Sequence, residues 1–520
     1  MSLKMFAAID VGSYELTCKI FEYSPKNGMK AVDVIHHRLA LGNDTFATGK
    51  VSQEKVNELC KVLQDFSQIM KSYGVEAYRA YGTSAIRETK NATILLDQIA
   101  QRTGIRIGTI SNSEQRFLGY KAIASKGEDF NQTIEKGTVI LDIGGGSIQI
   151  SLFNKDTLMA TQNLKLGVLR LRESLSRIDV VPSKQDSLLE EMISAQLSVV
   201  KKMYMKDKEI ETIIVVDDYV PNLLQQLDQP EGKKGFLSLE QFEDYWNEMH
   251  TTSVEVLSKK YGMPEENIGL LSISSAVIRR LAKMMEAKQL WVPGVTLCDG
   301  IGYEYGESKG LLKPDHDFEQ DIVACAQNIS KRYMGSKKRG ETLEKITTNI
   351  FDHMKKIHGM GDRERLLLRL AAILHDCGKY ISMSNLGECS YNIILSTEII
   401  GLSHREREIL ANVVKFNHVE FVYENEIGRE TDLSKEDYLL IAKLTAILKV
   451  ANGLDRSHKQ KFKDTQVSLK DNTLVFTVAT AADISLEKGL FSERAAFFEE
   501  VYNMKPVIKQ KKLMDCVKVS

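Results

Sequence analysis

Short apolar runs alternate with longer amphipathic segments along the first 310 residues of the chain. Apolar runs bounded by small polar residues are typical of strands, and apolar residues spaced three or four apart are typical of helices. We expect strands over 6–10, 16–21, 77–82, 105–110, 139–143, 148–153, 211–216 and 290–297, and helices over 52–73, 91–103, 114–124, 183–205, 239–260 and 274–288. The strand from Ala77 should run into a small-residue turn that ends at Arg87. This alternation predicts an α/β architecture with parallel strands.

The pattern changes near Leu311, after which helical patterns continue to about residue 451 with almost no strand signal. Strand patterns return after Asp464, in two short runs. A chain of 520 residues is too long for a single core. We expect four domains, namely two α/β halves, an all-α domain and a small α+β tail, over 1–125, 126–310, 311–464 and 465–520.

Two segments repeat one pattern, an apolar run that ends in Asp and is followed by glycine and serine. The first is Phe6–Ser13 and the second is Val139–Ser147, and a second apolar run follows each of them. Each pair of runs predicts a β-hairpin with a tight turn. Small residues in such a turn let backbone N–H groups approach a phosphate, and an adjacent Asp can hold a divalent cation. One such loop is more often a plain hairpin, but the pair predicts two halves that face a shared phosphate cleft.

The two loops supply the first candidate site residues. For phosphate binding these are Gly12, Ser13, Gly144, Gly145, Gly146 and Ser147. For a metal ion they are Asp10 and Asp142. The pairing resembles the signature of the actin-like (ribonuclease H-like) phosphotransferase fold, in which duplicated halves each contribute one phosphate loop.

Two further segments carry groups suited to phosphate chemistry. Thr83 and Ser84 offer hydroxyl groups after a strand, and Arg87 offers a planar fork of donors that matches a phosphate. Glu114 stands at a strand-to-helix junction, where it could orient a water molecule and accept its proton. Each has a simpler explanation: Arg87 as a solvated surface residue, and Glu114 as a helix-capping residue with Ser111 or Ser113 as the cap.

Residues 1 to about 310 resemble the exopolyphosphatase/guanosine pentaphosphate phosphatase family. The resembling motifs are Ala7–Ser13, Gly82–Arg87, Ser113–Arg116 and Asp142–Ser147. The resemblance implies that Glu114 is the general base, that Arg87 binds phosphate, and that Asp142 is associated with the metal. It also implies a Mg²⁺ or other divalent cofactor, inorganic polyphosphate or guanosine pentaphosphate as substrate, and a homodimer.

The chain departs from this family beside both loops. Tyr14 replaces a polar amide residue after the first loop, and Gln149 replaces a glutamate after the second. We retain Gln149 as a candidate catalytic residue, although the change removes one negative charge. Asp217 and Asp218 replace a glycine- and threonine-rich turn, and their carboxylates would repel a polyanion.

A second chemical candidate lies in the helical region. His375-Asp376, followed by Gly378 and later by Asp455, resembles the core of HD-domain metal phosphohydrolases. Imidazole and carboxylate together suit a transition metal. The helix expected to carry the first ligand, 340–351, has no histidine, so we expect an HD-like domain that is more often structural than metal-binding; His418 remains a possible ligand.

Composition narrows the classes of partner. The net charge is −1, so no overall basic field favours nucleic acid or an anionic membrane. The seven cysteines form no C-x-x-C pair, and no signal peptide or membrane span is expected, which favours the cytoplasm.

Three functions remain open from the sequence. The first is a Mg²⁺-dependent phosphoanhydride hydrolase that uses the cleft between the two halves. The second is a regulatory protein that binds polyphosphate or a nucleotide at a weakened site. The third is a metal phosphohydrolase that uses His375 and Asp376.

Overall fold

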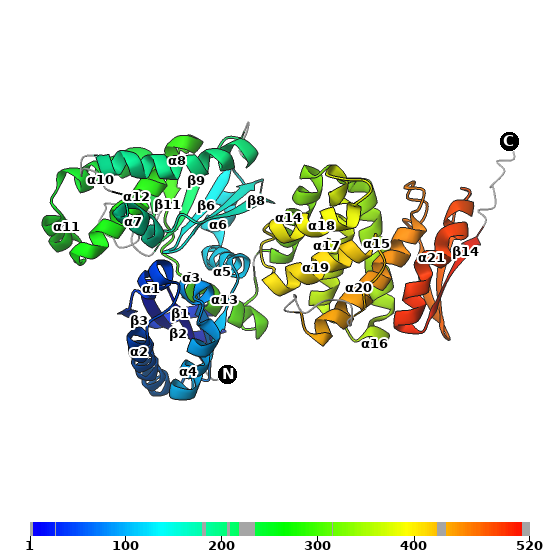
Figure 1. Ribbon diagram of the computed structural model, residues 1–520, viewed down its shortest axis with the longest axis horizontal. Coiled ribbons are helices and arrows are strands. Elements are labelled where there is room, and N and C mark those ends of the chain that lie inside the picture. Colours follow the sequence, from blue (N-terminus) through cyan, green and yellow to red (C-terminus); the bar gives the residue numbers. More distant parts are fainter. Residues whose placement is uncertain are drawn as a thin grey trace. The chain divides into compact units, whose positions relative to one another are not determined.

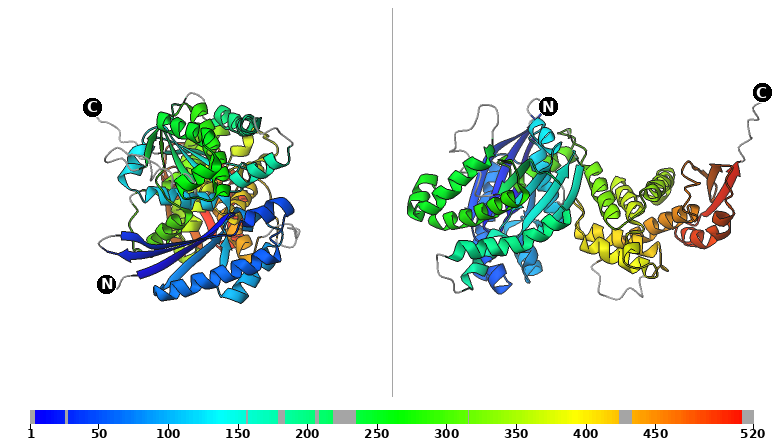
Figure 2. Two further views of the ribbon diagram at one scale, coloured as in Figure 1. Left: turned by 90° about the vertical axis from the view of Figure 1, so that its left-hand side faces the viewer. Right: turned by 90° about the horizontal axis from the view of Figure 1, so that it is seen from above.

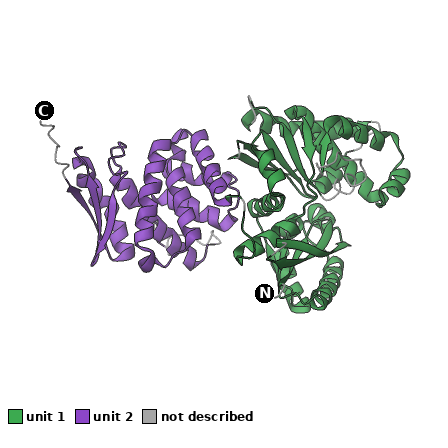
Figure 3. Ribbon diagram, turned by 180° about the vertical axis from the view of Figure 1, so that it is seen from behind, with its two compact units in different colours: residues 1–317 green, residues 318–520 purple. Residues whose placement is uncertain are grey.

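The computed structural model describes residues 4–25, 28–155, 157–178, 184–204, 208–217, 235–314, 316–423 and 433–511. The chain divides into two compact units, 1–317 and 318–520 (Figure 3). The first unit contains two sheets. The second contains a group of helices and one small sheet (Figure 1).

The first sheet has the strand order β3-β2-β1-β4-β5. Its strands are β1 (Lys4–Val11), β2 (Glu15–Ser24), β3 (Gly28–Arg38), β4 (Ala77–Gly82) and β5 (Ile107–Thr109). β1, β2 and β3 pair antiparallel, whereas β4 and β5 continue the sheet in parallel with β1.

Successive residues of β1 point to opposite faces of this sheet, and helices cover both faces. On one face, Ile9 packs with Phe66 of α2 (Gln53–Ser72), beside α4 (Ala92–Thr103). On the other face, Phe6 packs with Leu118 of α5 (Asn112–Ala124) and Ile301 of α13 (Leu297–Ser308). The chain therefore returns to the first sheet after it has built the second.

The second sheet has the order β10-β11-β9-β6-β7-β8. Its strands are β6 (Thr138–Ile143), β7 (Ile148–Asn154), β8 (Thr157–Leu164), β9 (Thr212–Asp217), β10 (Phe236–Ser238) and β11 (Gln289–Trp291). The helices beside it are α7 (Val168–Ser176), α8 (Gln185–Tyr204), α10 (Leu239–Thr251), α11 (Val254–Tyr261) and α12 (Glu265–Met285) (Figure 2). Leu141 of β6 shares its core with Leu197 of α8 and Val277 of α12.

The second unit is helical up to Leu454, as the sequence predicts. Its main helices are α14 (Phe318–Arg332), α15 (Lys337–His353), α17 (Asp362–Leu374), α18 (Leu386–Ser396), α19 (His404–Phe416) and α20 (Lys435–Leu454). A small sheet of β12 (Gln466–Lys470), β13 (Thr473–Ala479) and β14 (Lys505–Lys511) follows, with α21 (Ser485–Tyr502).

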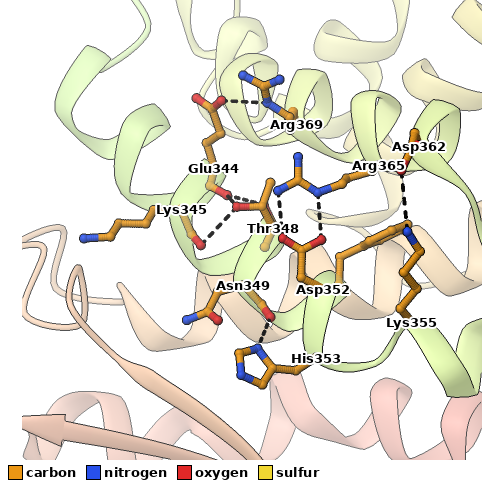
Figure 4. Close-up of polar contacts among 12 residues, drawn as sticks. Glu344, Lys345, Thr348, Asn349, Asp352, His353, Lys355, Asp362, Arg365 and Arg369 are labelled. Atoms are coloured by element: carbon orange, nitrogen blue, oxygen red, sulfur yellow. Dashed lines mark hydrogen bonds and ion pairs between the residues drawn. The ribbon is translucent and has the colours of Figure 1, made fainter.

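Ion pairs join α15 to α17 along their outer sides (Figure 4). The Arg365 guanidinium holds Asp352 through two hydrogen bonds of 2.8 Å, and this lowers the pKa of Asp352. Arg369 reaches Glu344 at 3.0 Å. These groups are all at least partly exposed, so each pair contributes about 1 kcal/mol or less to stability.

Four sequence expectations need correction. The helix expected over 239–260 is two helices, α10 and α11, because Ser253 has extended backbone and begins a new helix as its N-cap. The segment after Gly82 is a short helix, α3 (Ser84–Glu88), rather than a turn, since the Arg87 N–H donates to the Thr83 carbonyl. β11 ends at Trp291 instead of 297, because Pro293 cannot donate a sheet hydrogen bond. α12 begins at Glu265, nine residues before the expected start, and Pro264 with two glutamates marks that beginning.

Candidate functional site

A cavity of about 560 Å³ lies in the first unit, between the loops of its two sheets. Most of the site residues expected from the sequence line it. These are Asp10, Gly12, Ser13, Thr83, Ser84, Asp142, Gly144, Gly145, Ser147 and Gln149. The three others, Arg87, Glu114 and Gly146, are not among the residues that line it.

The two hairpins close in the same way. The Gly12 N–H donates to the Glu15 carbonyl at 3.1 Å, and the Gly144 N–H donates to the Ser147 carbonyl at 3.0 Å. A Cβ atom on Gly12 would lie 2.6 Å from that Glu15 oxygen, so this turn requires glycine. In each hairpin an Asp stands two residues before the glycine that closes the turn.

The loops of the two halves lie against each other. A Cβ atom on Gly146 would come within 2.8 Å of the Ser84 Oγ, and one on Gly145 would come within 3.1 Å of Ser13. The Ser13 Oγ lies 2.8 Å from the Ser84 Oγ and accepts from the Ala85 N–H. Glycine in the second loop therefore leaves room for the hydroxyl groups of the first half.

Asp10 and Asp142 bring two partly buried carboxylates to the cavity, which Asp217 also lines. Burial and the nearby Asp142 raise the pKa of Asp10 to about 7. Burial also raises the pKa of Asp142 to about 7, although the Arg116 guanidinium opposes that rise. The Asp10 Oδ1 is buried without a hydrogen-bond partner. Two carboxylates that repel each other in a buried place are stabilised by a cation.

These residues fit a magnesium ion. Mg²⁺ is usually held by one or two carboxylates, and water and substrate phosphates complete its coordination. Within the described ranges, no three His, Cys, Asp or Glu side chains are grouped as a metal site. A pair of carboxylates that shares its cation with a phosphate needs no such group.

Asp217 lines the cavity, where its carboxylate has a protein donor. It is buried at the end of β9 and accepts a hydrogen bond from the Ser274 hydroxyl. Its charge still adds to the raised pKa of Asp142. Its expected companion, Asp218, lies outside the described residues.

Glu114 is part of a capping box at the start of α5. Its Oε2 accepts from the Ser111 N–H at 2.8 Å, while the Ser111 hydroxyl accepts from the Glu114 N–H. The simpler role expected for Glu114 is therefore present, with Ser111 as the cap. Among the described residues, its Oε1 has no hydrogen-bond partner.

Arg87 lies close to the start of the same helix. Its Nη1 donates to the Ile110 carbonyl at 2.8 Å and contacts the Gln115 side chain at 3.4 Å. Gln115, which follows Glu114, lines the cavity. Arg87 is thus held beside the α5 start rather than on the cavity wall.

Tyr14 lines the cavity and also packs into the second half of the unit. Its ring is 7% exposed and packs in the core of the second sheet. Its hydroxyl donates to the Asn267 side chain on α12 at 2.5 Å. Tyr14 therefore links the first phosphate loop to the other half of the unit.

Several cavity residues have no counterpart in the sequence-based site. His36 and Arg38 line the cavity from β3, the strand that the sequence pattern does not predict. β3 alternates between partly buried and exposed positions at the edge of its sheet, so it lacks a strong apolar signal. Both side chains bring basic groups to the wall, and this suits an anionic ligand.

Gln149 faces Asp142 across the second hairpin, as their strand register requires. Its Oε1 accepts from the Arg116 Nε at 3.1 Å, and the Arg116 Nη1 reaches the Thr161 hydroxyl at 2.5 Å. Arg116 is buried, at 3% exposure. The sequence could have indicated it, because it stands two residues after Glu114 on α5.

The second candidate site, in the helical unit, brings His375, Asp376 and Asp455 together with an arginine from another helix. His375, Asp376 and Asp455 are all buried, but the Arg339 Nε lies 3.5 Å from Asp455. Arg339 comes from the first turn of α15, immediately before the segment where a histidine ligand was expected. Its positive charge lies next to a carboxylate that a metal ion would need.

The histidines of this cluster are held neutral, and among the described residues the buried His375 Nε2 has no hydrogen-bond partner. Burial lowers the pKa of His375 to about 3 and that of His418 to about 4. His418 contacts the His375 carbonyl through its Nε2, which is then not open to a metal. His353, on the outer side of α15, contacts the Asn349 carbonyl instead (Figure 4).

Fold and site together define an α/β protein with two actin-like halves around one cavity. Residues 20–307, more than half of the chain, match the Ppx/GppA phosphatase family, and residues 323–494 match domain III of Ppx/GppA phosphatases. The chain belongs to the Ppx/GppA phosphatase family.

Curated relatives are similar over different lengths. Exopolyphosphatase 1 of Mycobacterium tuberculosis is 25% identical over 165 residues, which cover 31% of this chain and 45% of the relative. A bifunctional 3-dehydroquinate synthase/phosphatase of Fusobacterium nucleatum is 24% identical over 32% of this chain and 26% of its own length. The chain thus spans less than half of these two relatives. Guanosine-5'-triphosphate,3'-diphosphate pyrophosphatase of Aeromonas hydrophila is 19% identical over 81% of this chain and 82% of its own.

Solved structures share the fold of the first unit. The exopolyphosphatase of Cytophaga hutchinsonii aligns with a TM-score of 0.52 and 18% identity, over 59% of this chain and 98% of its own. The Ppx/GppA family member of Aquifex aeolicus aligns with a TM-score of 0.50 and 19% identity, over 61% and 100%. In the part of the chain that the structure describes, no helix combines the length and apolar character needed to cross a membrane.

Proposed function

We propose that this chain hydrolyses phosphoanhydride bonds and releases terminal phosphate from inorganic polyphosphate or guanosine pentaphosphate. The observation that carries the proposal is the pair of equivalent loops, which bring two partly buried aspartates and two small-residue turns to one cavity. Membership of the Ppx/GppA phosphatase family supports the reaction class. Relatives named for both substrates support the choice of substrate.

The phosphate chain would be held by the loops. The N–H group of Gly145 takes no part in the hydrogen bond that closes its turn, so it can donate to phosphate oxygens in the cavity. The hydroxyl groups of Ser13 and Ser84 lie beside this loop. Asp10 and Asp142 would hold Mg²⁺, which neutralises charge on the transferred group when it is bound.

Glu114 would act as the general base. Ser111 fixes one carboxylate oxygen through its N–H, which leaves Oε1 to take the proton from an attacking water molecule. The water oxygen forms the new bond to phosphorus while the bridging oxygen leaves with the rest of the chain. Arg87 would clamp the transferred phosphate group after releasing the Ile110 carbonyl, which holds it beside the helix start.

The test is phosphate release in the presence of Mg²⁺ by the wild-type chain and by Glu114→Gln. Glutamine keeps the shape of the capping residue but cannot accept the proton, so turnover should fall at least a hundredfold. Glu128→Gln, an exposed change on α6 (Glu128–Ile134), is the matched control. Unchanged turnover in Glu114→Gln would reject Glu114 as the base.

A second function is favoured by one observation. Because Glu114 serves a capping box and does not line the cavity, the site could bind a polyphosphate without turning it over. Calorimetry would then show tight binding of tripolyphosphate, with no phosphate released over hours. Turnover by the wild-type chain would exclude this alternative.

A further inference from the structure

Gln149 lines the cavity with an amide, at a position where the family resemblance implies a glutamate carboxylate. It lies on β7, directly opposite Asp142 of β6. Its side chain is 3% exposed and lines the cavity. A buried amide of this kind is normally hydrogen-bonded at both of its polar atoms.

Arg116 determines which way this amide points. A guanidinium has only N–H groups and can only donate, so the atom that faces the Arg116 Nε must be the amide oxygen. The hydroxyl of Thr161 fixes the guanidinium in turn, through Nη1. The Gln149 oxygen is therefore occupied, and the amide cannot rotate to present it to the cavity.

The other end of the amide is a donor that has no protein acceptor. Within the described part of the chain, the structure gives the Gln149 Nε2 no hydrogen-bond partner. The glutamate expected at this position would offer only acceptor oxygens, suited to a metal or to a water molecule. Gln149 offers an NH₂ group, which suits an anion.

We propose that Gln149 is a substrate-binding residue that donates its amide N–H to a phosphate oxygen, and that Arg116 is the positioning residue that fixes its orientation. The inference rests on the proposed function of the cavity. Arg116 also acts on the other strand of the hairpin, because its positive charge opposes the rise in the pKa of Asp142 that burial causes. A donor at this position contributes to holding the phosphate chain rather than to activating water.

The test is the binding of inorganic tripolyphosphate with Mg²⁺, measured by calorimetry on the full chain. Gln149→Leu removes the donor and should weaken binding about tenfold or more, the effect of a lost hydrogen bond to a charged group. Gln149→Glu should weaken it at least as much, since it adds a negative charge. Gln162→Leu is the matched control, because Gln162 lies on β8, donates to the Thr161 carbonyl and does not line the cavity.

Arg116 is tested by two substitutions. Arg116→Lys keeps a donor for the Gln149 oxygen and should retain most of the affinity, whereas Arg116→Met frees the amide to turn and should weaken binding as Gln149→Leu does. In turnover assays both Gln149 variants should raise KM more than they lower kcat.

The outcomes separate the two proposals. Wild-type binding that Gln149→Leu leaves unchanged would overturn the role of Gln149 and leave the proposed function intact. A wild-type chain that binds no tripolyphosphate would overturn both.

Discussion

Asp10 and Asp142 occupy equivalent positions in two hairpins, each two residues before a glycine whose N–H closes the turn. Each is partly buried, and the charge of Asp142 is one cause of the raised pKa of Asp10. Duplicated loops thus bring two carboxylates into mutual repulsion at one cavity. A bound cation would relieve that repulsion.

Replacement of Asp10 by Asn should stabilise the metal-free chain at pH 8. The folded pKa of about 7 lies above the unfolded value of 3.8, so stability is lost as the pH rises through this window. Removing the charge should recover up to about 4 kcal/mol at pH 8 and much less at pH 4. Thermal unfolding followed by the fluorescence of Trp246 and Trp291, both in the first unit, measures it. A lower Tm for the variant at pH 8 would contradict the account.

Mg²⁺ should raise the Tm of the wild-type chain more at pH 8 than at pH 6. The carboxylates must lose their protons before they bind the ion, and raised pKa values delay this to neutral pH. Asp142→Asn should remove most of the shift, whereas Asp33→Asn, on the partly exposed β3, should keep it. An equal shift at both pH values would mean that the ion binds elsewhere.

Substitutions of Glu114 should separate its contribution to stability from its contribution to activity. Glu114→Ala removes the capping box and should cost about 1 kcal/mol of stability in addition to activity. Glu114→Gln should lose activity with a smaller loss of stability, because glutamine also serves at this position of a capping box. Chemical denaturation of both variants makes the comparison, and equal stability of Ala and Gln would argue against the cap.

Arg339→Met should destabilise the helical unit by about 3–5 kcal/mol, because it leaves the buried Asp455 carboxylate without its partner. Hydrogen exchange of α17 peptides reports on this unit, since both tryptophans lie in the other one. The exposed Lys337→Met is the control.

The purified chain should also hold no stoichiometric transition metal at the cluster of His375, Asp376 and Asp455. A bound metal that His375→Ala releases would show that Arg339 does not replace one.

The helical unit should also lose stability on mild acidification. His375 and His418 have folded pKa values of about 3 and about 4, below the unfolded value of 6.5. Unfolded chains therefore take up protons that the folded chain cannot, and stability falls as the pH drops from 6.5, by up to about 2 kcal/mol per histidine at pH 5. Exchange of α17 should accelerate from pH 7 to pH 5, after correction for intrinsic rates. His375→Asn should reduce that change, and His353→Asn should not.

The local sequence pattern was sufficient to predict the two hairpin loops, which are the parts of the site formed by the backbone. The register of both hairpins, with Asp142 opposite Gln149, follows from apolar runs around small-residue turns. Pattern was insufficient where a side chain from a distant element decides the chemistry. Arg116 orients Gln149, and Asn267 binds Tyr14. Arg339 pairs with Asp455, which lies more than 100 residues further along the chain.

The same limit explains β3. A polar edge strand has no buried face of its own to mark it, and its pairing with β2 becomes visible only in the folded sheet. Its residues His36 and Arg38 line the cavity, although the sequence pattern does not predict them as site residues. Site residues on a polar edge strand are therefore the hardest to predict from the spacing of residues along the chain.

The central claim, that the cavity of the first unit hydrolyses phosphoanhydrides with Mg²⁺, is tested most directly by phosphate release from long-chain polyphosphate and from guanosine pentaphosphate. We predict that the wild-type chain releases phosphate from at least one of them only when Mg²⁺ is present, and that Asp142→Asn abolishes release while the fold is retained. Release that persists in Asp142→Asn, or that continues after Mg²⁺ is chelated, would contradict the account.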